Sequence, residues 1–303
     1  MTLEDTIRQI VEQVLTQTVE TNQETTNQVP QKTTLKNEKV DYSPVVSEVE
    51  VLEDVTATRM QDYLKVPNPV DSDFYQAMKT STPAQIGVWR AGSRPLTDTL
   101  VRFRAAHATA QDAVMNDVSE AFIREFNLTE LQSACRDKDE FLTRPDLGRQ
   151  LCPKSREILE KMGTAGVQLQ IIVVDGLSST AVEANVPDLL PALLQGLKQA
   201  NISTGAPLFV KYGRVAIMDC IGEVLKPQAA LVLIGERPGL ANAESLSAYL
   251  AYNPREGMVE SERTVVSNIH KGGTPAVEAG AHLVDIVKQI LAQKCSGIKL
   301  NLQ

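Results

Sequence analysis

The sequence predicts an α/β fold, with a parallel-sheet Rossmann-like domain preceded by a small helical region and a disordered N-terminal tether. Short apolar runs rich in β-branched residues, typical of strands buried on both faces, alternate with helical patterns. Strands that alternate with helices indicate parallel βαβ units with right-handed crossovers. We expect a targeting helix at 1–15, a flexible linker at 16–54, a helical region at 55–130 and the α/β domain at 131–303.

The stretch Pro207–Leu240 carries the clearest strand signals, and the other elements follow the same patterns. We expect strands at Leu208–Val210, Val215–Met218, Ala229–Ile234, Val167–Val174 and Thr264–Val266. We expect helices at Val55–Leu64, Ser72–Lys79, Leu96–Val118, Ser155–Met162, 181–199, Ala243–Tyr252 and Ala276–Gln293, one or two helical turns at Asp219–Leu225, and an irregular stretch at Leu131–Cys152.

The N-terminal residues carry their own pattern. Apolar residues recur at three- and four-residue steps, and Thr2 can cap the helix that they predict; these residues are Leu3, Ile7, Ile10, Val11, Val14 and Leu15. From Thr16 to about Ser47 the chain is polar and cannot offset its ordering entropy, which is typical of a tether. A short helix on a tether indicates a docking peptide, and the alternative is a helix packed on the main body.

Composition excludes several classes of function. The net charge of −8 argues against nucleic-acid binding. No apolar run approaches the roughly 20 residues of a membrane span, and no secretory signal pattern is present. The four cysteines are scattered without a Cys-x-x-Cys pair, which favours reduced thiols in a cytosolic protein over a zinc site.

Two features before the α/β domain have a functional and a structural interpretation. The loop Gln85–Pro95 holds Arg90 and Arg94 among glycines, which suits an anion, but a surface loop paired to acids of a neighbouring subunit is the alternative. His107 lies in the helix that follows, where a hydrogen-bonded structural histidine is more usual than a ligand.

Three loops are expected at strand ends on one rim of the sheet. They are Asp175–Thr180, Gly235–Gly239 and Asn268–Pro275, and they bring Asp175, Glu236, Arg237 and His270 together. This rim predicts a site for a nucleotide or a nucleotide-like cofactor. The dinucleotide fingerprint, the P-loop pattern and the Gly-x-Ser-x-Gly elbow are all absent. Asp175 alternatively caps a helix and forms a salt bridge, and His270 is alternatively a structural loop residue.

From about Ile86 to the C-terminus the chain resembles the small (light) subunit of ethanolamine ammonia-lyase, an adenosylcobalamin-dependent enzyme. Eight blocks in one order carry the resemblance: Gly92–Pro95, Leu100–Arg104, Leu142–Arg149, Asp175–Ser178, Phe209–Val215, Gly235–Leu240, Ser267–His270 and Gly272–Pro275.

The resemblance implies that cobalamin lies between this subunit and a large subunit, whose barrel binds ethanolamine. The family's cofactor contacts fall on Val215, Glu236 and Val265. The last position departs from the family's cysteine, so a contact through backbone or packing would survive there and one through sulfur would not. The cofactor supplies the radical chemistry, and no catalytic residue is expected in this chain.

The resemblance also implies a location in a bacterial microcompartment of the cytoplasm, with a shell or core protein as partner of the N-terminal helix. Because no Asp-x-His-x-x-Gly loop is present, we expect cobalamin in its base-on form. Two alternatives stay open: a stand-alone nucleotide-binding enzyme that uses Asp175, Glu236 and His270, and a scaffold subunit that does not bind the cofactor.

Overall fold

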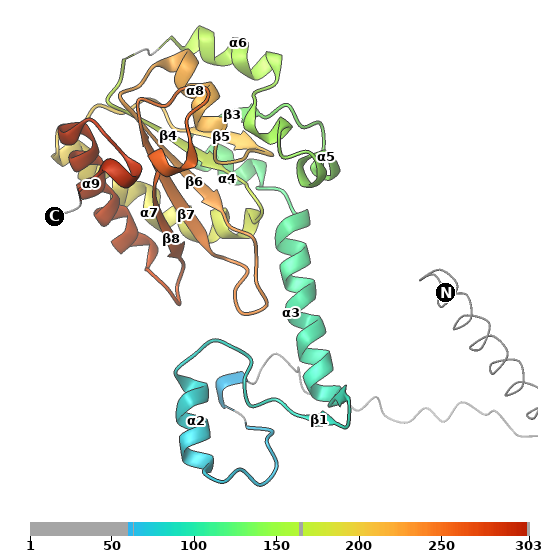
Figure 1. The fold of residues 1–303 in the computed structure, drawn as a ribbon. Coiled ribbons are helices and arrows are strands. Elements are labelled where there is room, and N and C mark those ends of the chain that lie inside the picture. The colour runs from blue at the N-terminus through green and yellow to red at the C-terminus, as the bar shows by residue number, and fades with distance from the viewer. Residues whose placement is uncertain (1–59, 63, 164–165, 302–303) are drawn as a thin grey trace, which may run out of the picture. The chain divides into compact units, whose positions relative to one another are not determined.

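The computed structural model describes residues 60–62, 64–163 and 166–301 (Figure 1). The expected helix at 1–15, the expected linker at 16–54 and most of the expected helix Val55–Leu64 lie outside these residues. The α/β fold class is confirmed, because a six-stranded, largely parallel sheet with helices forms the C-terminal part.

The sheet has the strand order β3-β5-β4-β6-β7-β8. The bounds are β3 Thr129–Gln132, β4 Leu169–Val174, β5 Leu208–Lys211, β6 Ala229–Gly235, β7 Leu246–Tyr252 and β8 Thr264–Ile269. The first four strands of this order are parallel, whereas β7 is antiparallel to β6 and β8 is antiparallel to β7. Two reversals give β8 the direction of β6. Strands β4, β5, β6 and β8 therefore end at one side of the sheet, which we call the carboxyl edge.

Helices cover both faces of the sheet. They are α4 Glu120–Glu125, α6 Pro153–Met162, α7 Ser179–Gln199, α8 Ile217–Leu225 and α9 Ala276–Gln293. On one face α4, α7 and α9 pack on residues such as Ile171 and Leu231, and on the other α6 and α8 pack on residues such as Ile172 and Val232. We call these the α7–α9 face and the α8 face. Alternate residues of one strand serve opposite faces, so a strand covered on both sides is apolar throughout, as in β4.

The expected helix Ala243–Tyr252 is wrong, because this segment forms strand β7, antiparallel to β6. Its alanines and leucines suit a helix, but Leu246, Ala248 and Leu250 alternate along the strand into the α7–α9 face. The expectation of parallel units throughout is therefore wrong at this end of the sheet, where β6, β7 and β8 follow one another without an intervening α-helix.

The expected strand Val215–Met218 is also wrong. Helix α8 begins at Ile217, and it contains the helical turns expected at Asp219–Leu225. Ile217, Ile221 and Leu225 are spaced by four residues and bury one helical face against the sheet. The helix ends at Lys226, whose backbone is left-handed (φ 49°).

The stretch expected to be irregular, Leu131–Cys152, contains short regular elements. They are the end of β3, helix α5 Lys138–Thr143 and the 3-10 turn η2 Leu147–Arg149. Strand β3 lies at the end of the sheet order and buries one residue, Leu131, which is too little for an alternating pattern to be visible.

The residues before the sheet form short helical elements and one long helix. They are η1 Met60–Asp62, α2 Ser72–Thr80, the two-residue strands β1 Arg90–Ala91 and β2 Arg94–Pro95, and α3 Thr97–Met115. Helices α2 and α3 match the expected ones within a few residues, as α6, α7 and α9 do. The last 3-10 turn, η4, covers Gly297–Lys299, and η3 covers Glu260–Glu262.

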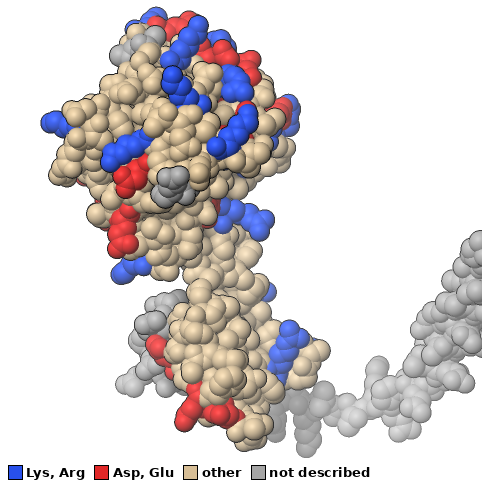
Figure 2. All heavy atoms as spheres, turned by 60° about the vertical axis from the view of Figure 1, so that its left-hand side comes forward, with Lys and Arg blue, Asp and Glu red and all other residues tan. Residues whose placement is uncertain are grey.

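Within the described residues, no helix combines the length and the apolar character that a membrane span requires. On the side of the molecule shown in Figure 2, lysine and arginine side chains are interspersed with aspartate and glutamate over the sheet-containing part.

Candidate functional site

The three predicted loops meet at the carboxyl edge. Asp175 follows β4, Glu236 follows β6 and His270 follows β8, whose last residues are aligned by the strand register. The loops are also in contact. The Leu177 N–H donates a hydrogen bond of 3.0 Å to the Gly235 carbonyl, and the Asn268 N–H reaches a Glu236 carboxylate oxygen at 3.5 Å. The predicted gathering of these loops is confirmed.

Glycine at this edge serves contacts between loops. A Cβ at Gly235 would overlap the Ser178 carbonyl oxygen, and a Cβ at Gly176 would overlap the Gly235 carbonyl oxygen. Gly176 is also left-handed, with φ of 59°. The close approach that these glycines permit is between the loops after β4 and β6.

Asp175 organises this edge from inside the protein. It is buried, and its carboxylate accepts backbone N–H groups of Gly176 (2.8 Å), Tyr212 (2.8 Å) and Gly213 (3.3 Å). The cap of α7 is Ser178 instead, whose hydroxyl accepts the Ala181 N–H at 3.0 Å. Asp175 therefore joins the turn after β4 to the turn after β5, and neither predicted role, ligand binding or helix capping, describes these contacts.

Burial raises the pKa of Asp175 from 3.8 to about 6, although the backbone donors oppose this shift. A raised pKa means that the folded protein holds the proton more tightly than the unfolded chain does. The contribution to stability is therefore complete below pH 3.8 and is lost as the pH rises through about 6.

We expect the free energy of unfolding of the native protein to fall relative to that of Asp175→Asn between about pH 4 and pH 7. The expected fall is about 3 kcal/mol, since one pKa unit corresponds to about 1.4 kcal/mol. Denaturant titrations of both proteins across this pH range measure the difference between their free energies of unfolding. The contributions of all other carboxylates are the same in both proteins and cancel in this difference. A difference that does not change with pH contradicts the prediction.

Glu236 is held by the hydroxyl group of Ser247 in β7 and by that of Ser245, directly before this strand. One carboxylate oxygen accepts Ser245 Oγ–H at 2.8 Å, and the other accepts the Ser247 hydroxyl. Its backbone N–H donates to the Ser245 carbonyl at 2.9 Å, which extends the β6–β7 pairing by one residue. The side chain is half-buried and has no ion-pair partner in the described part of the chain, including the adjacent Arg237. The Glu236 carboxylate is thus oriented by the two serines and is not neutralised by an ion pair within the described residues.

Arg237 and His270 contribute less to the edge. Arg237 is exposed and, with His107 of α3, lines a separate cavity of about 670 Å³. His270 has both ring nitrogens occupied within its own loop, one by Asn268 Oδ1 (2.8 Å) and the other by the Gly272 N–H (3.0 Å). These contacts match the structural alternative for His270.

The residues Val215, Glu236 and Val265 share the α8 face. Val215 packs against the cluster of that face. Val265 pairs with Tyr249, and Tyr249 pairs with Val232 of the same cluster. The side chains of Val265, Tyr249 and Val232 therefore all point to the α8 face.

Glu236 belongs to this face by the alternation of β6. It follows Ile234 by two residues, and Ile234 lies in the α8-face cluster. Its partner Ser247 pairs directly with Ile234, which places that hydroxyl on the same face. Val265 is 50% exposed, so the face is open at β8 within the described residues.

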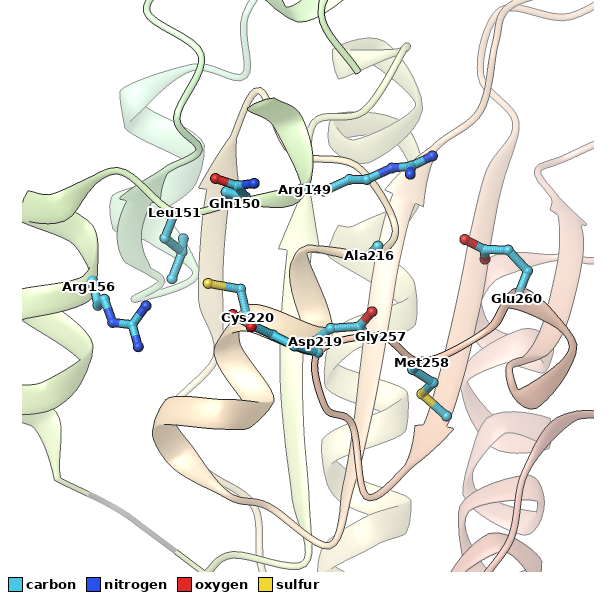
Figure 3. A pocket seen from close by; sticks show the side chains of 11 residues that line it. Arg149, Gln150, Leu151, Arg156, Ala216, Asp219, Cys220, Gly257, Met258 and Glu260 are labelled. Atoms are coloured by element: carbon cyan, nitrogen blue, oxygen red, sulfur yellow. The ribbon is translucent and has the colours of Figure 1, made fainter. Parts of the chain in front are cut away.

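A cavity of about 470 Å³ on the same face is lined by Ala216, the residue that follows Val215 in the sequence (Figure 3). Arg149, Ala216 and Met258 line it, together with Asp219, which forms a buried ion pair with Arg263 at 2.5 Å. Sequence reasoning did not find this ion pair, because its partners lie in α8 and before β8, 44 positions apart.

Among the described residues, no group of three or more His, Cys, Asp or Glu side chains is placed to hold a metal ion, and the four cysteines are free thiols. Arg90 and Arg94 of the glycine-rich loop are exposed, and anion binding there stays a prediction.

Comparison with known proteins shows the family to which the chain is similar. Residues 72–301 match the family model "Ethanolamine ammonia-lyase light chain (EutC)". The ethanolamine ammonia-lyase small subunit of Clostridium tetani is 55% identical over 260 residues, which cover 85% of this chain and 87% of the relative. The small subunit of Clostridium perfringens is 51% identical (83% and 85% covered), and that of Listeria monocytogenes is 50% identical (82% and 84% covered).

Proposed function

The chain belongs to the ethanolamine ammonia-lyase light-chain family, and from this premise we propose that it binds adenosylcobalamin at an interface with a large catalytic subunit. The resulting complex converts ethanolamine to acetaldehyde and ammonia. One observation carries the proposal: Val215, Glu236 and Val265, which lie far apart in the sequence, share the α8 face of the sheet, which is open at β8.

The exposed groups suit a corrin. This ring is broad and largely apolar, and its rim carries primary amides whose N–H groups are donors. Val265 offers exposed apolar surface, and Glu236 offers a carboxylate that two serine hydroxyls orient toward the same face. A carboxylate accepts amide N–H groups in hydrogen bonds that are stronger than neutral ones.

When bound, adenosylcobalamin supplies the radical chemistry of the reaction. This chain's residues would bind the corrin rim at Glu236, cover apolar corrin surface at Val215 and Val265, and keep water from that side. We assign no catalytic residue to this chain. His270, the histidine of the carboxyl edge, is engaged by its own loop, which is consistent with a cofactor that keeps its benzimidazole on cobalt.

Co-expression with the large subunit tests the function. We expect the purified complex to turn over ethanolamine and to show a cobalamin absorbance spectrum. With nitrogen-15 in the benzimidazole, the electron paramagnetic resonance splitting of the cob(II)alamin state should change, as the base-on form requires. Turnover without the partner would favour the stand-alone enzyme, and assembly with unchanged cobalamin affinity would favour the scaffold.

We further propose that residues 1–15 dock the complex to a shell or core protein of a cytoplasmic microcompartment. The support is the apolar stripe of these residues and the polar stretch that follows them. Deleting residues 1–20 is expected to leave the activity of the purified complex intact and to release it from compartments. Full co-sedimentation of the truncated protein with shells would show that the docking role is wrong.

A further inference from the structure

Two arginines lie beside Val215 without a carboxylate partner in the described part of the chain. Arg149 is the last residue of the turn η2, and its exposed guanidinium forms no ion pair there. Arg214 stacks on the Phe141 ring at 4.1 Å and donates to the Phe141 carbonyl at 2.7 Å. Its Nε is buried and has no hydrogen-bond partner among the described residues.

The backbone joins the turn of Arg149 to the loop of Val215. The Arg214 N–H donates to the Gly148 carbonyl at 2.7 Å. Gly148 lies so close to Arg214 that a Cβ would come within 2.7 Å of Arg214 Cγ. The backbone of Arg149 is therefore held next to the loop that contains Arg214 and Val215.

Three of the nearby acids are paired with other arginines. Asp146, on the turn before Arg149, accepts two hydrogen bonds from Arg144 (3.0 and 2.8 Å). Across the cavity, Asp219 and Glu260 both pair with Arg263. Glu256 lines the same cavity but forms no ion pair with Arg149.

The two guanidinium groups also act on each other. Burial lowers the pKa of Arg214, and the charge of Arg149 lowers it further, while Cys135 and Asp175 oppose this shift. Neighbouring guanidinium groups that form no ion pair among the described residues favour an anionic ligand, and the planar fork of a guanidinium matches the two oxygens of a phosphate.

We propose that Arg149 binds the phosphodiester of the cobalamin nucleotide loop. The proposal rests on the proposed function, because it takes Val215 as a neighbour of the bound cofactor. Cobalamin carries one anion outside the corrin, the phosphodiester that links the ring to its benzimidazole nucleotide. In Figure 3, Arg149 lies above Ala216 at the wall of the 470 Å³ cavity, and Ala216 directly follows Val215 in the sequence.

The test compares two corrinoids bound to the assembled complex of this chain with its large subunit. Cobalamin contains the phosphodiester, whereas cobinamide lacks both the phosphodiester and the nucleotide. We expect Arg149→Gln to weaken cobalamin binding about tenfold and to change cobinamide binding less than about twofold, as loss of one charged contact predicts. Arg156→Gln is the matched control, because Arg156 lines the same cavity but pairs with Glu160 at 3.6 Å; it should change neither affinity.

Several outcomes would overturn this assignment. They are equal losses for both corrinoids, no loss for either, and failure of the variant to assemble in gel filtration, which would place Arg149 in the subunit interface. If cobinamide binds too weakly to titrate, the dependence of cobalamin affinity on sodium chloride is measured instead. Arg149→Gln should reduce this dependence, and a dependence equal to that of the wild type overturns the assignment. A wild-type complex that binds no cobalamin would instead overturn the proposed function itself.

Discussion

Replacing Arg263 by alanine is expected to lower the free energy of unfolding by about 3–5 kcal/mol. The Arg263 side chain is 1% exposed, and it pairs with Asp219 at 2.5 Å and with Glu260 at 2.6 Å. Removing it leaves the carboxylate of Asp219 inside the protein without a compensating charge. Burial already raises the pKa of Asp219, while Arg263 opposes that shift, so the carboxylate depends on this partner. Denaturant titration of the full-length chain measures the effect.

Two further variants separate the ion pair from general damage. Replacing both partners, with Asp219→Leu and Arg263→Met together, should restore much of the loss, because no buried charge is then left alone. Arg124→Ala should cost less than about 1 kcal/mol, because Arg124 and Glu120 form an exposed pair. A cost for Arg263→Ala as small as that for Arg124→Ala would contradict the prediction.

This ion pair also matters for the site. Arg263 directly precedes β8, which carries Val265, and Asp219 lies in α8, which follows Val215. The pair therefore ties two of the three proposed cofactor contacts together across the α8 face. If the ion pair is removed, we expect the positions of Val215 and Val265 relative to each other to be less well fixed, in addition to the loss of stability.

Much of the fold was predictable because each strand and helix around the parallel core carries its own pattern. Strand β4 is apolar throughout, and α9 begins and ends at the predicted residues, Ala276 and Gln293. Strand β7 was missed because its alternation is made of alanine, leucine, serine and tyrosine, which also suit a helix. Only pairing with β6, a contact between distant residues, decides for the strand.

The meeting of the candidate-site loops was predictable, and the contacts within the candidate site were less so. The meeting of the loops after β4, β6 and β8 follows from strand direction, and the sequence order is enough to infer it. The serines that hold Glu236 lie within the segment taken for a helix, so their role could not be recognised. The engagement of Asp175 by the turn after β5 likewise depends on contacts between loops that no local pattern records.

The orientation of Glu236 leads to the central prediction. Its carboxylate is fixed by Ser245 and Ser247, and it does not cap a helix, because the element that follows is strand β7. A hydrogen bond to a charged group contributes roughly 1.5–3 kcal/mol. Glu236→Ala should therefore weaken cobalamin binding by about tenfold to a hundredfold. Glu236→Gln should cost less, because the amide carbonyl still accepts, and Glu244→Ala is a matched control at an exposed glutamate of the same loop.

The deciding measurement is a cobalamin titration of the assembled complex that contains Glu236→Ala, followed by the change in absorbance. Gel filtration should show that the variant assembles as the wild type does. The account predicts an affinity at least about tenfold weaker than that of the wild type and of Glu244→Ala. An affinity within about threefold of the wild type in a fully assembled complex would contradict the claim that this face of the sheet binds the cofactor through Glu236.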